Sequence, residues 1–212
     1  MEQQRKVVFF ETDSAIAAYA GIGVVSARIA ADSAYKLAGS SASALISIGL
    51  AGALKPQLKV GDIVQPAVIR DAVDNLKIET RLGKGTLVTA SVVASRAYKQ
   101  QLAEQFQADA VDMEAYAVAD VAQVYGVPFA AIKAISDELH FEMPPLNRFV
   151  TPEGQFRTGA FALHVAARPW LLSQTMVLGR NSATAIAALT KRLQNVVSDG
   201  PKSLYNIANS SQ

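Results

Sequence analysis

The stretch AVDMEAYAVADVAQVYGVPFAAIKAISD, residues 110–137, decides the fold. Its first half is rich in alanine and valine on every side, which predicts a buried helix from Asp112 to Tyr125, ended by Gly126. The run VPFAAIKAIS that follows is short and continuously apolar, as buried strands are. A helix leading directly into a buried strand is the repeating unit of layered α/β proteins.

The rest of the chain shows the same alternation of short apolar runs with alanine-rich segments. We expect one domain over residues 1–212 with an α/β fold, a three-layer α/β/α arrangement around a central mixed sheet. Strands are expected at 6–12, 14–23, 44–50, 59–69, 86–93 and 127–136, with a glycine-rich bend over 49–56. Helices are expected at 25–39, 95–106, 112–125 and 161–197, the last broken at Gly179 or Asn181, and residues after Ser198 are expected to be frayed.

Composition excludes several classes of protein. Half of the residues are hydrophobic, 18% are charged and the net charge is +2, with no run of like charges that would favour nucleic acid. The chain has no cysteine, which excludes disulfides and thiol catalysis and fits a reducing compartment. The N-terminal apolar run is too short for a signal peptide, and no apolar stretch reaches membrane-spanning length. We expect a soluble, cytoplasmic protein.

Two acidic segments stand at the ends of predicted elements. Asp112 and Glu114 lie where the buried helix begins, and Ser136 and Asp137 follow the strand of residues 127–136. Gly49 and Gly52 follow another buried strand, at the sheet edge where α/β proteins bind ligands. Helix capping, rather than ligand binding, is an alternative explanation for Asp112 and for Asp137. Glu114 at a buried helix end is either a partner of the helix dipole or a hydrogen-bond acceptor for a polar ligand such as a ribose.

The remaining motifs carry less information. Gly21 and Gly23 predict a tight turn with close backbone approach, but the full dinucleotide-binding pattern is absent. RLGKGT, residues 81–86, lacks the spacing of a phosphate-binding loop. The two histidines, His140 and His164, are not in metal-ligand spacing, so no metal and no cofactor are expected.

Two carboxylates without an activated serine, a cysteine or a metal suit the cleavage of a glycosidic bond. That reaction needs an acid for the leaving group and negative charge near the sugar, because its transition state resembles an oxocarbenium ion. We therefore expect Glu114 and Asp137 to be catalytic.

Three blocks resemble the purine nucleoside phosphorylase/nucleosidase superfamily of the phosphorylase–uridine phosphorylase type: GLAGALKPQLKVGDIV, VDMEAYAVADVA and AIKAISDE. The pattern is most similar to methylthioadenosine/S-adenosylhomocysteine nucleosidases. The region after Asp137, with SDELHFEMPPLNRFVTPEGQFR and the segment ARPWLLSQTMVLGRNSATAIAALTKRL, further resembles a hopanoid-associated branch, which implies release of adenine from adenosylhopane.

The resemblance assigns roles to residues of this chain. It implies that Glu114 accepts the ribose hydroxyls, that Met113 packs on the sugar, and that Asp137 protonates purine N7 with Ser136 beside it. It also places Val92 and Val93 beside the base. The substrate-binding set expected around these residues is completed by Asp112, Gly21, Gly23, Leu50, Ala51 and Gly52.

The chain also departs from the family pattern. The first strand of the family, with an acid that orients water, has no counterpart here, and Glu11 is not in its context. Ser47 and Leu50 stand where phosphorylases carry an arginine and a serine, so hydrolysis is favoured over phosphorolysis.

Two alternatives stay open: a phosphorylase that binds phosphate through Arg28, Arg70 or a partner subunit's arginine, and a nucleoside-binding protein with impaired catalysis. The resemblance implies a homodimer. The apolar C-terminal helix is expected to be core or dimer surface, or else a wall for an apolar 5′-substituent.

Overall fold

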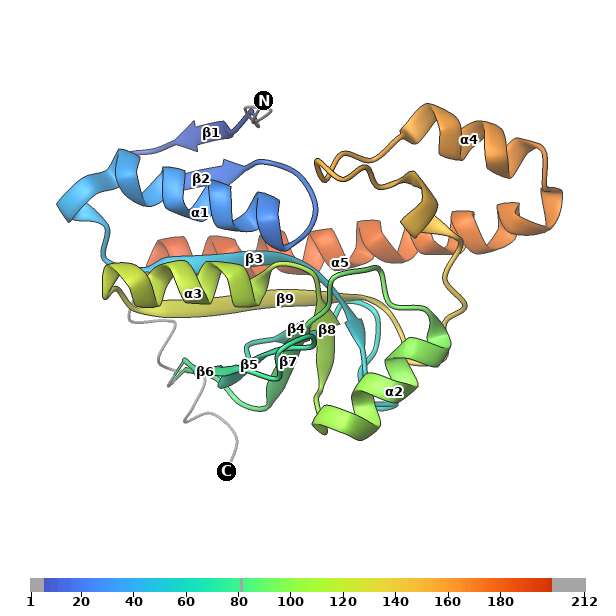
Figure 1. Cartoon of the computed structure of the whole chain (residues 1–212), viewed down its shortest axis with the longest axis horizontal. Helices are drawn as coiled ribbons and strands as arrows, with labels where there is room; N and C mark the ends of the chain where they lie inside the picture. The colour runs from blue at the N-terminus through green and yellow to red at the C-terminus, as the bar shows by residue number, and fades with distance from the viewer. Residues whose placement is uncertain (1–5, 81, 200–212) are drawn as a thin grey trace.

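The structure is a computed structural model that describes residues 6–80 and 82–199 (Figure 1). A seven-stranded mixed sheet has the order β4-β9-β3-β8-β7-β5-β6. Its strands are β3 (Leu45–Ala53), β4 (Ile63–Val64), β5 (Val68–Asp71), β6 (Lys77–Glu79), β7 (Thr86–Thr89), β8 (Ala110–Asp112) and β9 (Phe129–Asp137). A separate hairpin is made by β1 (Val8–Glu11) and β2 (Ile16–Tyr19).

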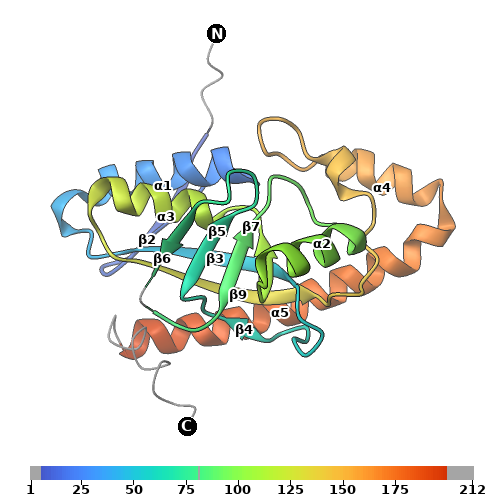
Figure 2. The same cartoon turned by 60° about the horizontal axis from the view of Figure 1, so that its bottom comes forward.

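Five α-helices surround these strands in the described part of the chain: α1 (Val24–Ala38), α2 (Arg96–Phe106), α3 (Ala115–Tyr125), α4 (Thr158–Ala166) and α5 (Leu172–Asp199). Three short 3₁₀ helices, η1 (Gly39–Ser41), η2 (Leu146–Phe149) and η3 (Pro169–Leu171), connect them. Figure 2 shows α1 and α3 on one face of the sheet and α5 on the other. The expected three-layer α/β/α fold with a mixed sheet is therefore confirmed.

Small apolar residues allow these layers to approach closely. The alanines of α3 pack on β3 and β9 in the largest core cluster, and Tyr35 of α1 stacks on Tyr125 of α3 with ring centroids 3.8 Å apart. On the opposite face, Ala185 and Leu189 of α5 pack against Ile132 of β9. A third cluster joins α2 to β7 and β8. The sheet is thus covered where β9 and β3 lie side by side.

The central strand β3 has one open edge. It pairs in parallel with β9 along its whole length, but in the described ladders its pairing with β8 covers Gly52 and Ala53 alone. Ile48, in the middle of the strand, is accordingly 47% exposed. The hairpin of β1 and β2 pairs within itself and does not fill this edge.

The boundaries differ from those predicted by the sequence at several points, among them the helix expected over 161–197, which is divided into α4 and α5 by η3, and three more in β3, α3 and α5. The bend expected over residues 49–56 is wrong in its first part, because β3 continues to Ala53 and changes register between Ala51 and Gly52. Asp112 ends β8 and Glu114 immediately precedes α3, so the helix begins later than expected. The predicted break at Gly179 or Asn181 is also wrong. A side chain at Gly179 would meet open space, so α5 passes through it as an ordinary helical residue.

The frayed end expected after Ser198 lies almost entirely outside the described residues. No helix of the described part of the chain is both long enough and apolar enough to cross a bilayer.

Candidate active site

Glu114 lies in the short connection between β8 and α3 and is held by two backbone donors. Its Oε1 accepts the N–H of Gly23 at 2.9 Å, and its Oε2 accepts the N–H of Met113 at 3.2 Å. Gly23 has a φ of 91° and directly precedes α1, a backbone conformation that favours glycine. The turn predicted from Gly21 and Gly23 therefore positions the glutamate.

The surroundings of Glu114 alter its titration. Burial raises the pKa of the Glu114 carboxyl above its ordinary value, and the neighbouring charge of Asp112 raises it further. Lys133 and the two backbone donors act in the opposite direction but do not outweigh burial. Each carboxylate oxygen has two lone-pair sites, so both oxygens can still accept a hydroxyl proton from a ligand.

Asp112 forms a buried ion pair beneath Glu114. Its Oδ2 lies 2.8 Å from Nζ of Lys133 and accepts the N–H of Ala115 at 2.9 Å, and its Oδ1 accepts the hydroxyl of Thr89 at 2.7 Å. Asp112 and Lys133 are both almost fully buried. Since its oxygens are bonded inside the protein, Asp112 fastens the start of α3 to β7 and β9. Its contact with a substrate stays a prediction.

Asp137 ends β9 and forms a second buried ion pair. Its Oδ1 accepts the hydroxyl of Ser136 at 2.8 Å, and Lys99 of α2 pairs with its Oδ2. Lys99 also donates to the main-chain oxygen of Glu138 at 2.8 Å. The carboxylate, the hydroxyl and the ammonium thus form one polar group at the end of an entirely buried strand.

Gly52 brings the two acidic segments together. In β3 it pairs with Val111 of β8 on one side and with Asp137 of β9 on the other. A side chain at this position would lie 2.8 Å from Oδ2 of Asp137 and 3.1 Å from Cε of Lys99, which is too close. Glycine is therefore required here because the Asp137 carboxylate lies over it. The acidic segments of β8 and β9 meet on either side of one strand, as the sequence predicted.

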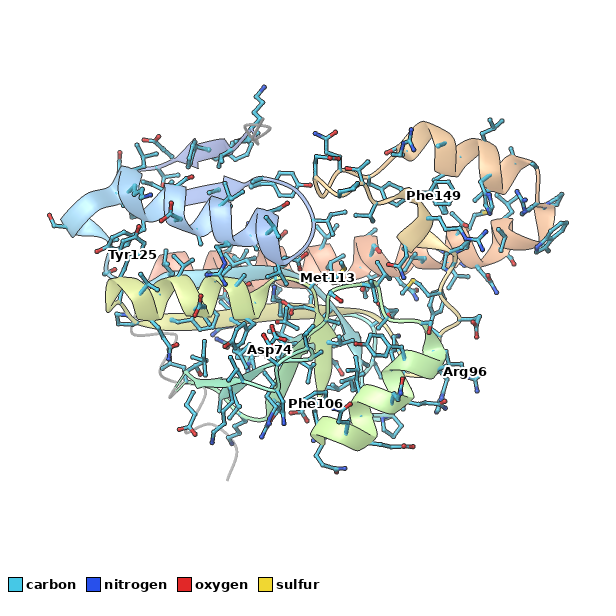
Figure 3. The ribbon with its side chains drawn as sticks, viewed as in Figure 1. Asp74, Arg96, Phe106, Met113, Tyr125 and Phe149 are labelled. Atoms are coloured by element: carbon cyan, nitrogen blue, oxygen red, sulfur yellow. The ribbon has the colours of Figure 1, made fainter. Side chains whose placement is uncertain are left out.

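The remaining predicted residues lie around this centre. Leu50 and Ala51 precede Gly52 in β3, and Met113 lies half-buried at the amino end of α3 (Figure 3). Val92 and Val93 lie in the loop between β7 and α2, and both backbone groups of Val93 are bonded by the amide of Asn147. None of these positions has a described ligand contact, and their roles stay predictions.

A second loop closes over the glycine turn. The main-chain oxygen of Gly154 accepts the N–H of Ile22 at 2.7 Å, and a side chain at Gly21 would lie 2.8 Å from that oxygen. Residues 151–155 are thereby packed against the turn that holds Glu114. The close backbone approach predicted at Gly21 is present, and its partner is this loop.

Two hollows in the described part of the molecule are lined by residues other than Glu114 and Asp137. One of about 440 Å³ lies between β6 and α3, and one of about 340 Å³ is lined in part by Glu138 and His140. Asp137 is almost fully buried, and Glu114 is half-buried immediately before α3.

No group of three potential metal-binding side chains occurs among the described residues. His164 instead packs edge-on against Phe149, with Arg168 beside it. Burial, and the positive charges of Arg168 and Arg148, lower the pKa of the His164 ring.

The sequence did not predict two of the charged residues, Lys99 and Lys133. Lys133 is the sole charge in the run FAAIKAIS, which signals a buried partner for it. Lys99 lies on the same face of α2 as the buried Leu102 and Phe106, at helical spacing, and this position on an apolar face is the signal that could have found it.

Comparison with known proteins identifies the family. The sequence pattern of the phosphorylase superfamily matches residues 2–81 and 67–165. The aminodeoxyfutalosine nucleosidase of Campylobacter jejuni is 25% identical over 162 residues, 61% of this chain and 70% of that protein.

Solved structures share the fold. The 5′-methylthioadenosine/S-adenosylhomocysteine nucleosidase of Helicobacter pylori has a TM-score of 0.56 and 21% identity, over 85% of this chain and 79% of that one. The futalosine hydrolase of the same organism has a TM-score of 0.52 and 17% identity, over 89% of each chain. With two matches that together span residues 2–165, this chain belongs to the phosphorylase superfamily of enzymes.

Proposed function

We propose that this protein is a nucleosidase that hydrolyses the N-glycosidic bond of a 5′-substituted adenosine and releases adenine. The observation that carries the proposal is that Gly52 pairs with Asp137 on one side and, on the other, with Val111, three residues before Glu114, within a phosphorylase-superfamily chain. The similarity to nucleosidases in sequence and fold supports it.

Glu114 binds the sugar in this proposal. One carboxylate can accept both hydroxyls of a ribose diol, and its two backbone donors leave lone pairs for this purpose. Its negative charge also stabilises the oxocarbenium-like sugar as the bond to the base breaks. Met113 packs on the sugar.

Asp137 serves the leaving base. As the bond between C1′ and N9 breaks, N9 keeps the electron pair and N7 takes a proton, so the adenine leaves neutral. The Lys99 ammonium in contact with Asp137 is a proton source that can act through the carboxylate. Ser136 fixes the carboxylate orientation, and Val92 and Val93 lie beside the base. Water attacks C1′ and loses a proton, which balances the hydrolysis.

Hydrolysis is favoured over phosphorolysis by the positions of two arginines. Arg28 pairs with Asp120 of α3, and Arg70 donates to the side chain of Asn75 at 2.9 Å. Both guanidinium groups thus bind protein partners, and Ser47 is buried within β3. A phosphate dianion would have to break these contacts to be held, at a cost that water does not incur.

The experiment measures free adenine after incubation with 5′-methylthioadenosine, S-adenosylhomocysteine, aminodeoxyfutalosine and adenosylhopane in phosphate-free buffer. Release from at least one of them is expected, and Asp137→Asn should lower the rate by about 10²–10⁴-fold because general acid catalysis is lost. Asp74→Asn, at an exposed turn after β5, is the matched control and should retain full activity.

The possible results separate the alternatives. Cleavage that depends strictly on added phosphate would establish a phosphorylase. Binding of the nucleosides by calorimetry without any release, and with unchanged affinity in Asp137→Asn, would establish a nucleoside-binding protein. The hopanoid-type 5′-substituent and the homodimer remain predictions, tested by the choice of substrate and by sedimentation equilibrium.

A further inference from the structure

Residues 154–182 form an extension that we call the arm: the loop 154–157, α4, η3 and the first turns of α5. Figure 1 shows the arm in orange at the right, beyond the end of the sheet opposite to the one that α1 and α3 cover. It has a small aromatic base, in which Phe149 contacts Phe156, Phe161 and His164. The arm is thus a packed structure, although Val165 is its one buried side chain beyond Gly154.

Large apolar side chains of the arm lie exposed. Leu163 of α4 is 73% exposed, Trp170 of η3 is 69% exposed and Met176 of α5 is 61% exposed, and Leu172 is half exposed. Single exposed apolar residues are common on soluble proteins, but four on one short extension form a surface that usually has a binding partner.

The charge of the same segment identifies a class of partner. From Gly154 to Ser182 the sequence has no aspartate or glutamate, and it carries Arg157, Arg168 and Arg180. The chain as a whole is nearly neutral, so this imbalance is local. A surface of this kind is complementary to a partner that has negative charges at its surface and an apolar layer beneath them.

We propose that the arm docks on an anionic lipid surface. Tryptophan prefers the headgroup level of a bilayer, leucine and methionine reach the acyl boundary, and arginine pairs with lipid phosphates. A second copy of the chain is a less suitable occupant, since symmetric pairing of the arm would bring its arginines together. The docking is peripheral, as no described helix can span a bilayer.

The arm borders the candidate active site through its base. The oxygen of Gly154 accepts the N–H of Ile22, one residue before the glycine that holds Glu114, and Asn147 binds the loop of Val93. Docking would therefore bring the turn that holds Glu114 near the lipid surface. The proposal itself does not rest on catalysis, because its measurements are of binding.

Trp170 is the single tryptophan of the chain and reports directly on the docking. Vesicles of phosphatidylglycerol and phosphatidylcholine in equal parts should shift its emission to shorter wavelength and carry the protein into the pellet. Neutral phosphatidylcholine vesicles should bind at least about tenfold more weakly, and Arg157→Gln with Arg180→Gln should weaken binding about fivefold per arginine.

The double variant Leu163→Ser with Leu172→Ser keeps the reporter and should weaken anionic-vesicle binding at least about tenfold. Its matched control is Val73→Ser with Leu76→Ser, two exposed apolar residues between β5 and β6 that lie outside the arm, and it should bind as the parent does. Adenine release from a water-soluble nucleoside should be equal in both variants, which separates this test from that of the proposed function.

Three results would overturn the proposal. One is the absence of an emission shift with either kind of vesicle. Another is equal binding to neutral and anionic vesicles, or equal loss in the control variant. The last is an emission shift that develops with protein concentration alone and is lost in Leu163→Ser with Leu172→Ser, which would show that a second copy covers the arm.

Discussion

The floor of the candidate site and the arm have opposite chemistry. Beneath the site, Asp112 with Lys133 and Asp137 with Lys99 are charged pairs that are almost fully buried. In the arm, Leu163 and Trp170 are apolar and mostly exposed. Charges are usually exposed to water and large apolar side chains usually buried, and both regions depart from that distribution.

The difference teaches which features have a purpose beyond folding. Burying an ion pair contributes little to stability compared with packing apolar residues of the same size, so two pairs at one sheet edge indicate a functional site. Exposing a tryptophan likewise gains nothing for the isolated fold. Residues whose type does not suit their structural environment, such as buried charges, are found mainly at functional sites. Changes in the floor should be costly to the fold, and changes in the arm should not.

The largest effect is expected for Lys133→Met. It leaves Asp112 buried without its counter-ion and should lower the free energy of unfolding by about 3–5 kcal/mol, measured by urea denaturation. Lys133→Met with Asp112→Asn removes both charges and should restore most of this loss, since the asparagine Oδ1 can still accept from Thr89 or Ala115. If Lys133→Met alone were as stable as the parent, the ion pair between Asp112 and Lys133 would not be formed in solution.

A smaller effect is expected for Gly52→Ala. The new Cβ would lie 2.8 Å from the Asp137 carboxylate, so that group must move, at about 1–3 kcal/mol of stability and a loss of adenine release. Gly49→Ala, three residues earlier in β3, is the matched control, because its Cβ would lie 3.5 Å from Nζ of Lys133, an ordinary contact. Equal activity of the two variants would contradict the placement of Asp137 over Gly52.

Much of this architecture could be predicted from the sequence. The helix 115–125 and the strand 129–137 follow from periodicity and from the order of elements. Those signals are local, and the strands they identify are long or apolar enough to be recognised. Both acidic segments flank β3, but β8 runs antiparallel to it and β9 parallel, which the expectation of one shared sheet edge did not include.

What could not be predicted depends on contacts between distant segments. The three-residue strands β6 and β8 are too short for any periodicity. The spacing of Lys99 with Leu102 and Phe106 indicates a buried side chain, but its partner Asp137 is 38 positions away and could not be identified from the helix. The continuity of α5 through Gly179 likewise results from its packing on β9, which outweighs the helix propensity of one glycine.

The titration of Glu114 should give a pH-dependent effect smaller than the preceding two. Burial raises its pKa in the folded state, so the unfolded chain releases the proton first as the pH rises. The stability that protonated Glu114 provides is complete below its ordinary pKa of 4.5 and is lost between 4.5 and the raised value. The parent should therefore lose stability relative to Glu114→Gln across that window, and adenine release should rise as the ribose-binding carboxylate ionises.

Urea denaturation at a series of pH values measures this difference. Glu104→Gln, at an exposed position of α2, is the control: it shows how far a Glu→Gln substitution without burial alters the pH dependence of the free energy of unfolding. A difference between parent and Glu114→Gln that is constant with pH would contradict the burial of the Glu114 carboxyl.

The smallest effect is expected in the arm, and it completes the comparison. Trp170→Ser removes the largest exposed apolar side chain of the arm but no buried contact, so the free energy of unfolding should change by less than about 0.5 kcal/mol. Phe149→Ala, at the buried aromatic base, is the contrasting variant and should cost about 3–5 kcal/mol, because it opens a cavity among Phe156, Phe161 and His164. If Trp170→Ser destabilised the protein as much as Phe149→Ala does, the tryptophan would be packed in solution, and the arm would be part of the core rather than a surface available to a partner.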